Sequence, residues 1–171
     1  MTFSAAILTV SDRCSRGETT DTAGPALAQA LHDTLQARVI ATACIPDNRD
    51  EIAQQLTTWA HADDAPALIL TTGGTGLSPR DNTPEATLDV LDRHHPGFVE
   101  LIRATCGKAN PRAYLSRAQA GTIASSLVIN LPGSQRGALE SLAAVSQLLP
   151  HAVGVLTGQS ANCGETKQGS R

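Results

Sequence analysis

The chain has 171 residues with a net charge of −3, 41% apolar residues and 2% aromatic residues. This length suits one domain with its own hydrophobic core. The weak net charge, the lack of a Lys/Arg cluster and the scarcity of aromatic rings argue against nucleic-acid binding. No stretch approaches the roughly 20 apolar residues of a membrane helix. We therefore expect neither a nucleic-acid partner nor a membrane location.

The beginning of the chain and its cysteines indicate a cytoplasmic protein. The first residues predict a strand directly and lack the basic and apolar segments of a signal peptide. The cysteines at positions 14, 44, 106 and 163 are too far apart for a Cys-x-x-Cys zinc or redox motif. We therefore expect free thiols in the reducing cytoplasm.

Apolar patterns with the periods of strands and helices alternate through the first half of the chain. The run 5–10 is bounded by polar residues and indicates a buried strand. Leu27, Leu31 and Leu35 recur at helical spacing after Pro25, which suits the first turn of a helix. A second strand at 38–45, a second helix through Ile52, Leu56 and Trp59, and a third strand at 67–71 follow in order.

The second half continues the alternation with shorter elements. Thr83 is expected to cap a helix that has Pro84 in its first turn and Leu88 and Leu91 on its buried face. Further along we expect a helix break at 94–97, a new helix from Phe98, and a loop over 107–122 with a short helix near 113–119. A strand at 127–131 should follow. The chain should end with one last helix through Ala138, Leu142, Val145 and Leu149 and a polar tail from 157.

Strands that alternate with helices predict a layered α/β domain with a mostly parallel, Rossmann-like sheet. We expect one domain over residues 1–156 and a flexible polar tail over 157–171. In such sheets, ligands bind beyond the carboxyl ends of the strands. Four strand exits carry polar or glycine-rich residues and are expected to converge on one pocket, namely 11–13, 46–48, 73–76 and 132–134.

The most informative segment joins a strand to a helix through a glycine-rich turn. Gly73, Gly74 and Gly76 allow backbone N–H groups to approach a ligand closely, because no Cβ blocks them. Thr72 and Thr75 add hydroxyl groups. Together these groups indicate a phosphate-bearing ligand, and the alternative is an ordinary tight turn between strand and helix.

Two common nucleotide-binding motifs are excluded at this turn. A P-loop requires a Gly-Lys-Ser/Thr triplet, and none follows the glycines. The dinucleotide-binding fingerprint requires a third glycine where this chain has Pro79. The turn therefore predicts a phosphate site of another kind.

Carboxylates near the turn indicate a magnesium site. Asp81 follows the turn and Asp47 lies at a neighbouring strand exit, and Mg²⁺ is typically held by one or two carboxylates with phosphates and water. Asp12 is a weaker third candidate. Taken singly, Asp81 could be a solvated loop acid, Asp47 could begin an Asx-turn and Asp12 could cap a turn near Arg13. Arg80 either contacts the ligand or pairs with Asp81.

Residues 132–134 precede the last predicted helix. Free N–H groups at a helix start and the Ser134 hydroxyl can hold an anion, although Ser134 can equally be an ordinary N-cap. Ser116 and Arg117 lie in a polar loop, and composition alone assigns them no role.

These motifs together resemble the Mog/MoaB-type proteins of molybdenum-cofactor biosynthesis, the molybdopterin adenylyltransferases. The most specific match is the string Thr-Thr-Gly-Gly-Thr-Gly-x-x-x-Arg-Asp-x-Thr-Pro-Glu at residues 71–85, and the resemblance covers roughly residues 3–155. Further matching segments lie at 7–12, 21–25, 46–47, 116–121 and 130–134. After Ser134, many relatives have a proline and a lysine where this chain has Gln135 and Arg136.

The resemblance implies a three-layer α/β/α fold of the molybdopterin-binding type, which forms a trimer or a hexamer. It implies transfer of AMP from MgATP to the terminal phosphate of molybdopterin, release of pyrophosphate, and a molybdate-insertion protein as a partner. The family's essential carboxylates correspond to Asp47 and Asp81, which would be catalytic and bind Mg²⁺. The implied substrate- and nucleotide-binding residues are Ser11, Asp12, Thr72, Gly73, Gly74, Thr75, Gly76, Arg80, Ser116, Pro132, Gly133 and Ser134.

Two alternative functions remain open at this point. One is a non-catalytic molybdopterin-binding or scaffold protein of the same pathway, and the other is a generic nucleotide-binding α/β module. Pterin binding without magnesium-dependent nucleotide binding would favour the first alternative. Nucleotide binding without pterin binding would favour the second.

Overall fold

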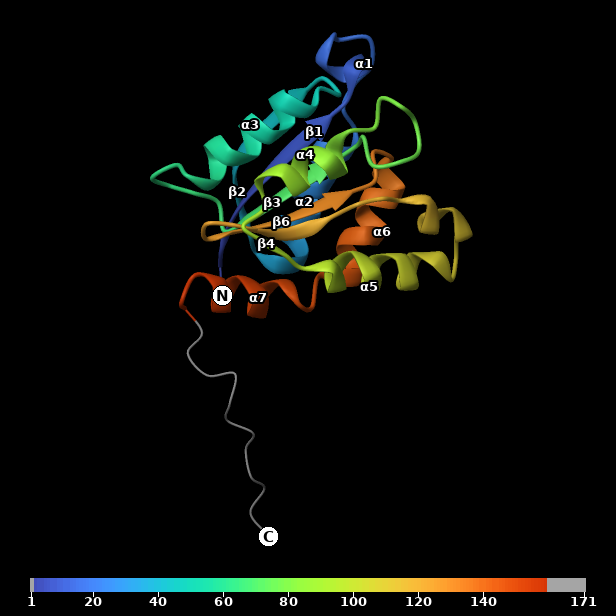
Figure 1. Cartoon of the computed structure of the whole chain (residues 1–171). Helices are drawn as coiled ribbons and strands as arrows, with labels where there is room; N and C mark the ends of the chain where they lie inside the picture. Colours follow the sequence, from blue (N-terminus) through green and yellow to red (C-terminus); the bar gives the residue numbers. More distant parts are fainter. Residues whose placement is uncertain (1, 160–171) are drawn as a thin grey trace.

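The computed structural model describes residues 2–159, with a six-stranded β-sheet of strand order β2-β1-β3-β6-β5-β4 at its centre (Figure 1). The strands are β1 (Ser4–Val10), β2 (Arg38–Ile45), β3 (Leu68–Thr72), β4 (Arg93–His94), β5 (Ala120–Ile123) and β6 (Ser126–Leu131). Strands β2, β1, β3 and β6 pair in parallel, whereas β5 pairs antiparallel with β6 and β4 pairs antiparallel with β5. The prediction of a mostly parallel sheet is confirmed.

Helices cover both faces of the sheet and complete three layers (Figure 1). One buried cluster joins α2, α5, α6 and α7 to one face, and a second joins α3 and α4 to the other. The three-layer α/β/α fold is therefore confirmed. The helices are α1 (Asp12–Ser15), α2 (Ala23–Leu35), α3 (Arg49–Ala60), α4 (Thr83–Val90), α5 (Pro96–Gly107), the 3₁₀ helix η1 (Pro111–Leu115), α6 (Gln135–Val145) and α7 (Leu149–Leu156).

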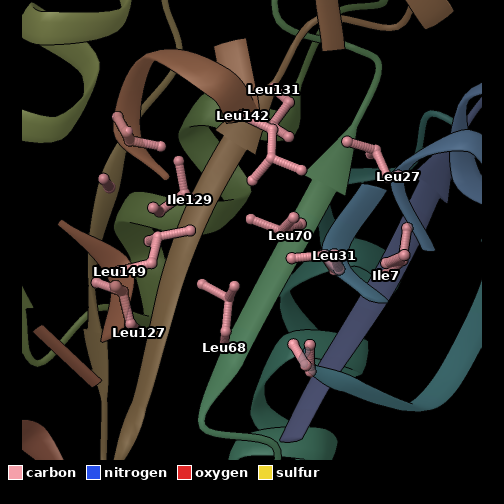
Figure 2. Packing of buried hydrophobic residues seen from close by; sticks show 14 of the residues in the cluster. Ile7, Leu27, Leu31, Leu68, Leu70, Leu127, Ile129, Leu131, Leu142 and Leu149 are labelled. Atoms are coloured by element: carbon pink, nitrogen blue, oxygen red, sulfur yellow. The ribbon is translucent and has the colours of Figure 1, made fainter. Parts of the chain in front are cut away.

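Side chains of the central strands alternate between the two clusters, because successive strand residues point to opposite faces of a sheet. In β3, Leu68 and Leu70 belong to the α2 side, whereas Ile69 belongs to the α3 side. Figure 2 shows Leu70 and Ile129 packed within the first cluster, where both are fully buried. Strands that are apolar on both faces are typical of a sheet covered by helices on both sides.

The predicted loop over 107–122 is only partly correct. It contains η1 and the beginning of β5, and the two-residue strand β4 pairs with β5 at the edge of the sheet. A Cβ at Gly121 would lie 2.3 Å from the Arg93 carbonyl oxygen, so glycine is what allows β4 to pair this closely. A strand with a central glycine gives a weak apolar signal, and the sequence therefore did not predict it.

The predicted single last helix is two helices. Helix α6 ends at Val145, and α7 begins at Leu149 with Pro150 in its first turn, after a bend of 69°. Proline is tolerated in a first turn because the N–H it lacks has no partner there. Within residues 2–159, no single helix is long and apolar enough to cross a membrane, and only this bent pair passes that test jointly, by length and composition. Residues 160–171, most of the predicted polar tail, lie outside the described residues.

The start of α4 also differs from the prediction. Asn82 occupies the N-cap position, whereas Thr83 is the first helical residue and is fully buried. Leu88, predicted to face the core, is 45% exposed, while Ala86 and Thr87 are fully buried. The reason is helical periodicity, because positions 83, 86, 87 and 90 share one face of the helix and position 88 lies opposite.

Candidate active site

The polar strand exits lie together at the carboxyl edge of the parallel strands, as predicted. The Ser11 N–H donates to the Ile45 carbonyl at 2.9 Å, which joins the exits of β1 and β2. The Gly73 N–H donates to the Leu131 carbonyl at 3.2 Å, which joins the exits of β3 and β6. Gly133 follows so closely that a Cβ there would lie 3.0 Å from the Gly73 Cα. The four exits therefore meet at one edge of the sheet, as predicted, but residues 11–13 and 46–48 do not line the cavity beside the glycine turn, so the prediction of one shared pocket is only partly correct.

The glycine turn after β3 is tightly packed against the rest of the protein. Gly73 and Gly74 have φ values of 109° and 60°, a region in which other residues are strained. A Cβ at Gly73 would lie 2.1 Å from the Val10 carbonyl oxygen, and one at Gly74 would lie 2.5 Å from Thr83 Oγ1. These glycines are therefore required by the packing of the turn itself, in addition to any approach of a ligand.

A cavity of about 370 Å³ lies beside the turn. The residues predicted for the site that line this cavity are Gly74, Thr75, Gly76, Asp81, Ser116, Pro132, Gly133 and Ser134. The cavity is also lined by residues of α5, η1, α6 and the segments beside them that were not predicted for the site, namely Cys106, Asn110, Arg112, Ala113, Leu115, Gly137, Glu140 and Ser141. These residues form no glycine-rich or acidic motif, so the sequence alone gave no signal for them.

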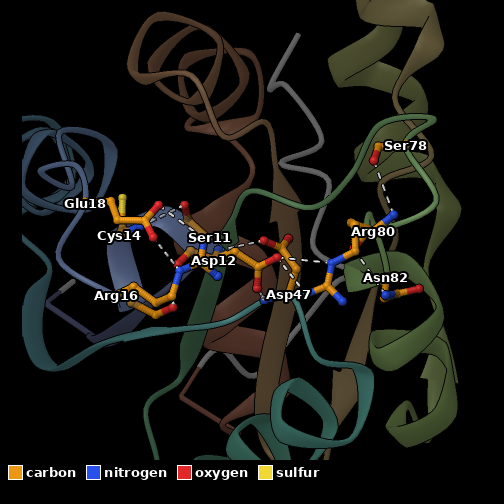
Figure 3. A network of polar contacts seen from close by, with 10 residues as sticks. Ser11, Asp12, Cys14, Arg16, Glu18, Asp47, Ser78, Arg80 and Asn82 are labelled. Carbon is orange, nitrogen blue, oxygen red and sulfur yellow. Dashed lines mark hydrogen bonds and ion pairs between the residues drawn. The ribbon is translucent and has the colours of Figure 1, made fainter.

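Asp12 and Asp47 form a reciprocal pair outside this lining (Figure 3). The Asp12 N–H donates to Asp47 Oδ2 at 2.8 Å, and the Asp47 N–H donates to Asp12 Oδ1 at 3.1 Å. Arg80 donates to Asp12 Oδ2 from Nε at 3.1 Å and from Nη2 at 2.6 Å. Arg80 therefore pairs with Asp12, and the predicted alternative of an Arg80–Asp81 pair is wrong. Asp12 links three strand exits and does more than cap a local turn.

Asp81 lines the cavity and is oriented by its own turn. Its Oδ2 accepts the Ser78 N–H at 3.0 Å, and its N–H donates to the Ser78 carbonyl at 2.9 Å. A Cβ at Gly76 would lie 2.9 Å from Asp81 Oδ2, so this carboxylate lies directly against the glycine turn. The backbone of the glycine turn and the Asp81 carboxylate therefore lie side by side.

The carboxylates of the site influence one another. Burial raises the pKa of Asp47 above its ordinary value, and the negative charges of Asp12 and Asp81 add to this rise. The hydrogen bond from Arg80 lowers the pKa of Asp12. Ionised Asp47 therefore lies in a region of excess negative charge, which a bound cation would relieve.

The oxygen atoms around Gly74 could serve a hard cation. Within residues 2–159, no three His, Cys, Asp or Glu side chains form a metal-binding group. A cation here would depend on one or two carboxylates together with ligand oxygens, which is the arrangement that Mg²⁺ uses. Asp47 Oδ1 and Thr83 Oγ1 lie 2.9 and 2.5 Å from the Cβ position of Gly74. The Thr83 hydroxyl is buried and has no partner within the described part of the chain.

Three hydroxyl-bearing residues predicted for the site have partners within the protein. Thr72 is 1% exposed and donates to the Pro132 carbonyl at 2.7 Å. It therefore joins β3 to the exit of β6 and is not directed toward a ligand, which corrects the expectation. Ser11 and Ser134 each accept a backbone N–H at 3.2 Å as the N-caps of α1 and α6. For Ser134, this confirms the N-cap interpretation and leaves its position in the cavity wall unchanged.

Arg117, to which composition assigned no role, contacts the loop that carries Asp81. Its Nε donates to the Gly76 carbonyl at 2.7 Å, and its Nη2 donates to the Asp81 carbonyl at 2.6 Å. Its guanidinium also forms an ion pair with Glu85 in the first turn of α4. The sequence signal was the resemblance of the 116–121 segment, which indicated Ser116 for the site and left Arg117 unexplained.

Replacement of Asp47 by Asn is expected to stabilise the free protein at neutral pH. Because the folded-state pKa of Asp47 is raised, the folded protein resists ionisation of this side chain, and ionisation lowers the free energy of unfolding. This loss develops as the pH rises from the unfolded-state pKa of Asp47 through its folded-state pKa. Asn removes this charge and keeps an oxygen that can accept the Asp12 N–H. The Tm difference should be positive at about pH 7 and vanish near about pH 3, where carboxyl groups are protonated.

Thermal unfolding with a chelator and without nucleotide measures this difference. Asp63→Asn is the matched control, because Asp63 is exposed on the loop after α3 and its replacement removes the same charge. The control should change the free energy of unfolding by less than about 0.5 kcal/mol at both pH values. A lower Tm for Asp47→Asn at neutral pH would contradict the assignment of Asp47 as a destabilised carboxylate.

The fold and site define an α/β protein with a cavity between a glycine turn and a helix start, beyond the carboxyl ends of a parallel sheet, where sheets of this kind bind their ligands. Comparison with known families agrees with this class and narrows it. Residues 6–151 match the family described as "Probable molybdopterin binding domain". The chain belongs to this family.

Individual relatives cover most of the chain. The molybdopterin adenylyltransferase of Helicobacter pylori (strain J99) is 39% identical over 92% of this chain and 89% of its own length. The crystal structure of the molybdopterin biosynthesis enzyme MoaB from Thermus thermophilus is 47% identical, covers 91% of this chain and 97% of that chain, and superimposes with a TM-score of 0.86. The molybdenum cofactor synthesis protein cinnamon of Drosophila melanogaster is 40% identical over 86% of this chain, which spans only 24% of that longer protein.

Proposed function

We propose that this chain is a molybdopterin adenylyltransferase, which transfers AMP from ATP to the terminal phosphate of molybdopterin and releases pyrophosphate. The observation that carries the proposal is the junction of the glycine turn with two carboxylates, Asp81 in the cavity wall and Asp47 beside Gly74. Family membership and the names of relatives such as the Helicobacter pylori enzyme support the same activity.

The cavity supplies two places for phosphate groups. Gly74 and Gly76 line it without side chains, so their backbone can approach a phosphate oxygen closely. Ser134 caps the eleven-residue helix α6, whose first N–H groups and dipole favour a negative charge. A ligand with several phosphate groups could contact the turn and the helix start together.

We propose that Asp47 and Asp81 hold Mg²⁺ with the triphosphate. The all-oxygen donor set, the raised pKa of Asp47 and the Thr83 hydroxyl, which has no partner within residues 2–159, fit this cation. When bound, Mg²⁺ would neutralise charge that develops on the departing pyrophosphate. The role of Asp12 is to fix Asp47 through the reciprocal hydrogen bonds, and Arg80 in turn fixes Asp12.

The reaction needs positioning more than acid–base help from the protein. An oxygen of the molybdopterin phosphate attacks the α-phosphorus of ATP, a new P–O bond forms, and the bond to pyrophosphate breaks with its electron pair on the leaving group. The nucleophile is already ionised, so no general base is required. The glycine turn and the start of α6 would hold the two phosphate chains in line.

Incubation of the purified protein with molybdopterin, ATP and Mg²⁺ tests the proposal. We expect adenylylated molybdopterin and pyrophosphate in equal amounts, both abolished by a magnesium chelator. A family member of known activity, assayed in parallel, controls for the quality of the molybdopterin. No product beside an active control would refute the proposal, and pterin binding without magnesium-dependent ATP binding would favour a non-catalytic carrier.

The proposal extends to assembly and location. We infer a homo-oligomer, a trimer or a hexamer, that passes its product to a molybdate-insertion protein in the cytoplasm, where free thiols such as Cys44 stay reduced. Exposed apolar side chains on several elements support an oligomer, including Leu101 on α5, Tyr114 on η1 and Val155 on α7. Light scattering on the purified protein checks this inference, and a monomeric mass at micromolar concentration would contradict it.

A further inference from the structure

The segment that precedes β5 is bound to helix α5 by two hydrogen bonds. Arg103 of α5 donates from Nε to the Ser116 carbonyl and from Nη2 to the Ala118 carbonyl, both at 2.9 Å. Both bonds are partly buried, and the two carbonyls flank Arg117 in sequence. The backbone of Arg117 is therefore anchored to a long helix on one side of the cavity.

The Arg117 side chain extends from this anchor to the opposite loop. Its guanidinium contacts the Gly76 carbonyl, the Asp81 carbonyl and the Glu85 carboxylate, and its backbone N–H donates to the Thr75 carbonyl at 2.9 Å. All four partners belong to residues 75–85, the segment that carries the glycine turn, Asp81 and the start of α4. The Arg117 side chain is 35% exposed, so these contacts are partly shielded from water.

Apart from the exposed ion pair of Arg80 with Asp12, the loop between Gly76 and Asp81 has few other restraints. It contains no helix or strand, and Leu77 in it is 66% exposed. Its internal hydrogen bonds run between Ser78 and its neighbours Arg80 and Asp81, so they shape the loop without fixing it to the core. The Arg117 contacts fix both ends of this loop to a separate part of the fold.

We propose that Arg117 is a positioning residue that fixes the loop from Gly76 to Asp81, so that the Asp81 carboxylate faces the cavity in one orientation. This inference rests on the proposed function, and it adds a residue that acts on the reacting groups only through Asp81. A guanidinium suits the role because its planar fork can donate to two carbonyls and a carboxylate simultaneously. The Glu85 carboxylate balances the positive charge of the Arg117 guanidinium. This ion pair gives a role to the acidic residue at the end of the 71–85 motif.

Two variants of Arg117 and one control test the proposal. In Arg117→Ala, we expect kcat to fall about 100-fold with the KM for ATP changed less than about threefold, because a displacement of about 1 Å can cost this much. Arg117→Lys should recover part of kcat, since an ammonium can pair with Glu85 but cannot bond both carbonyls in the same geometry. Arg38→Ala, at the amino end of β2 on the opposite edge of the sheet, removes the same charge and should leave kcat unchanged.

Amide hydrogen exchange tests the clamp without any assay of activity. In the free protein, Arg117→Ala should speed exchange in residues 76–82 about tenfold or more, the effect of losing hydrogen bonds to a charged group, and leave β1 and β6 unchanged. If the wild type transfers no AMP, the proposed function fails, yet the exchange rates still decide the role of Arg117. If exchange in 76–82 is unchanged, or if kcat is unchanged, the positioning role is refuted.

A second variant covers the case in which Arg117→Ala does not fold. Glu85→Gln keeps the side-chain shape and removes the charge that Arg117 contacts. It should lower kcat less than Arg117→Ala does and speed exchange in residues 76–82 by a smaller factor. No change in either quantity for Glu85→Gln would overturn the proposed function of the ion pair.

Discussion

Replacement of Asp81 by Asn is expected to lower the turnover of AMP transfer by about 1,000-fold, which corresponds to about 4 kcal/mol of transition-state stabilisation. The side chain lines the cavity beside Gly76, and its charge is proposed to hold the cation at the leaving pyrophosphate. Asn is nearly the same size and keeps an oxygen that can accept the Ser78 N–H. The loop should therefore retain its shape while the negative charge is lost.

Three measurements separate this loss of charge from a loss of structure. Turnover should fall, the Tm should stay within about 2 °C of the wild type, and the Mg²⁺ concentration for half-maximal rate should rise. Asp63→Asn again serves as the control, because it removes one exposed charge on the loop before β3, at the amino end of that strand and away from the carboxyl edge that carries the site. Unchanged turnover, or an unfolded variant, would contradict the catalytic role of Asp81.

The main elements of the fold could be predicted because their signals are local. Strand β2 has the predicted bounds 38–45, since Pro46 and the polar residues after it end the apolar run. Strand β4 has two residues and β5 contains Gly121, so neither has a local pattern, and both depend on pairing with each other and with β6. Elements that form only through pairing carry too little information in their own residues to be predicted from them.

The same division applies to the site. The convergence of Asp47 with the glycine turn follows from the rule that parallel strands end at one edge, and the structure confirms it. The partner of Arg80 could not be derived, because Asp12 lies 68 positions away and the adjacent Asp81 was the simpler choice. The contacts of Arg117 with residues 76–85 are equally remote in sequence and depend on the position of α5.

Replacement of Gly73 by Ala is expected to destabilise the fold by about 3 kcal/mol or more. The added Cβ would lie 2.1 Å from the Val10 carbonyl oxygen, far inside van der Waals contact, and the residue has a φ of 109°. A strained backbone position costs about 1–3 kcal/mol, and overpacking adds a similar amount. The atom that would have to move is backbone at the end of the inner strand β1, so the clash cannot be relieved by a side-chain rotation.

Substitutions at two other glycines separate the cost of backbone strain from the cost of the steric clash. The measurement is the free energy of unfolding from a urea titration. Gly17 has a φ of 69° and open space around its Cβ position, so Gly17→Ala should cost only the backbone strain of about 1 kcal/mol. Gly97 lies in the first turn of α5 with open space and ordinary φ, and Gly97→Ala should be neutral or stabilising by about 0.5 kcal/mol. A loss for Gly73→Ala no larger than that for Gly17→Ala would mean that β1 can yield to the turn. A loss for Gly73→Ala that exceeds that for Gly17→Ala would mean that β1 and the glycine turn at 73–76 form one rigid unit. The turn would then keep its shape before any ligand binds.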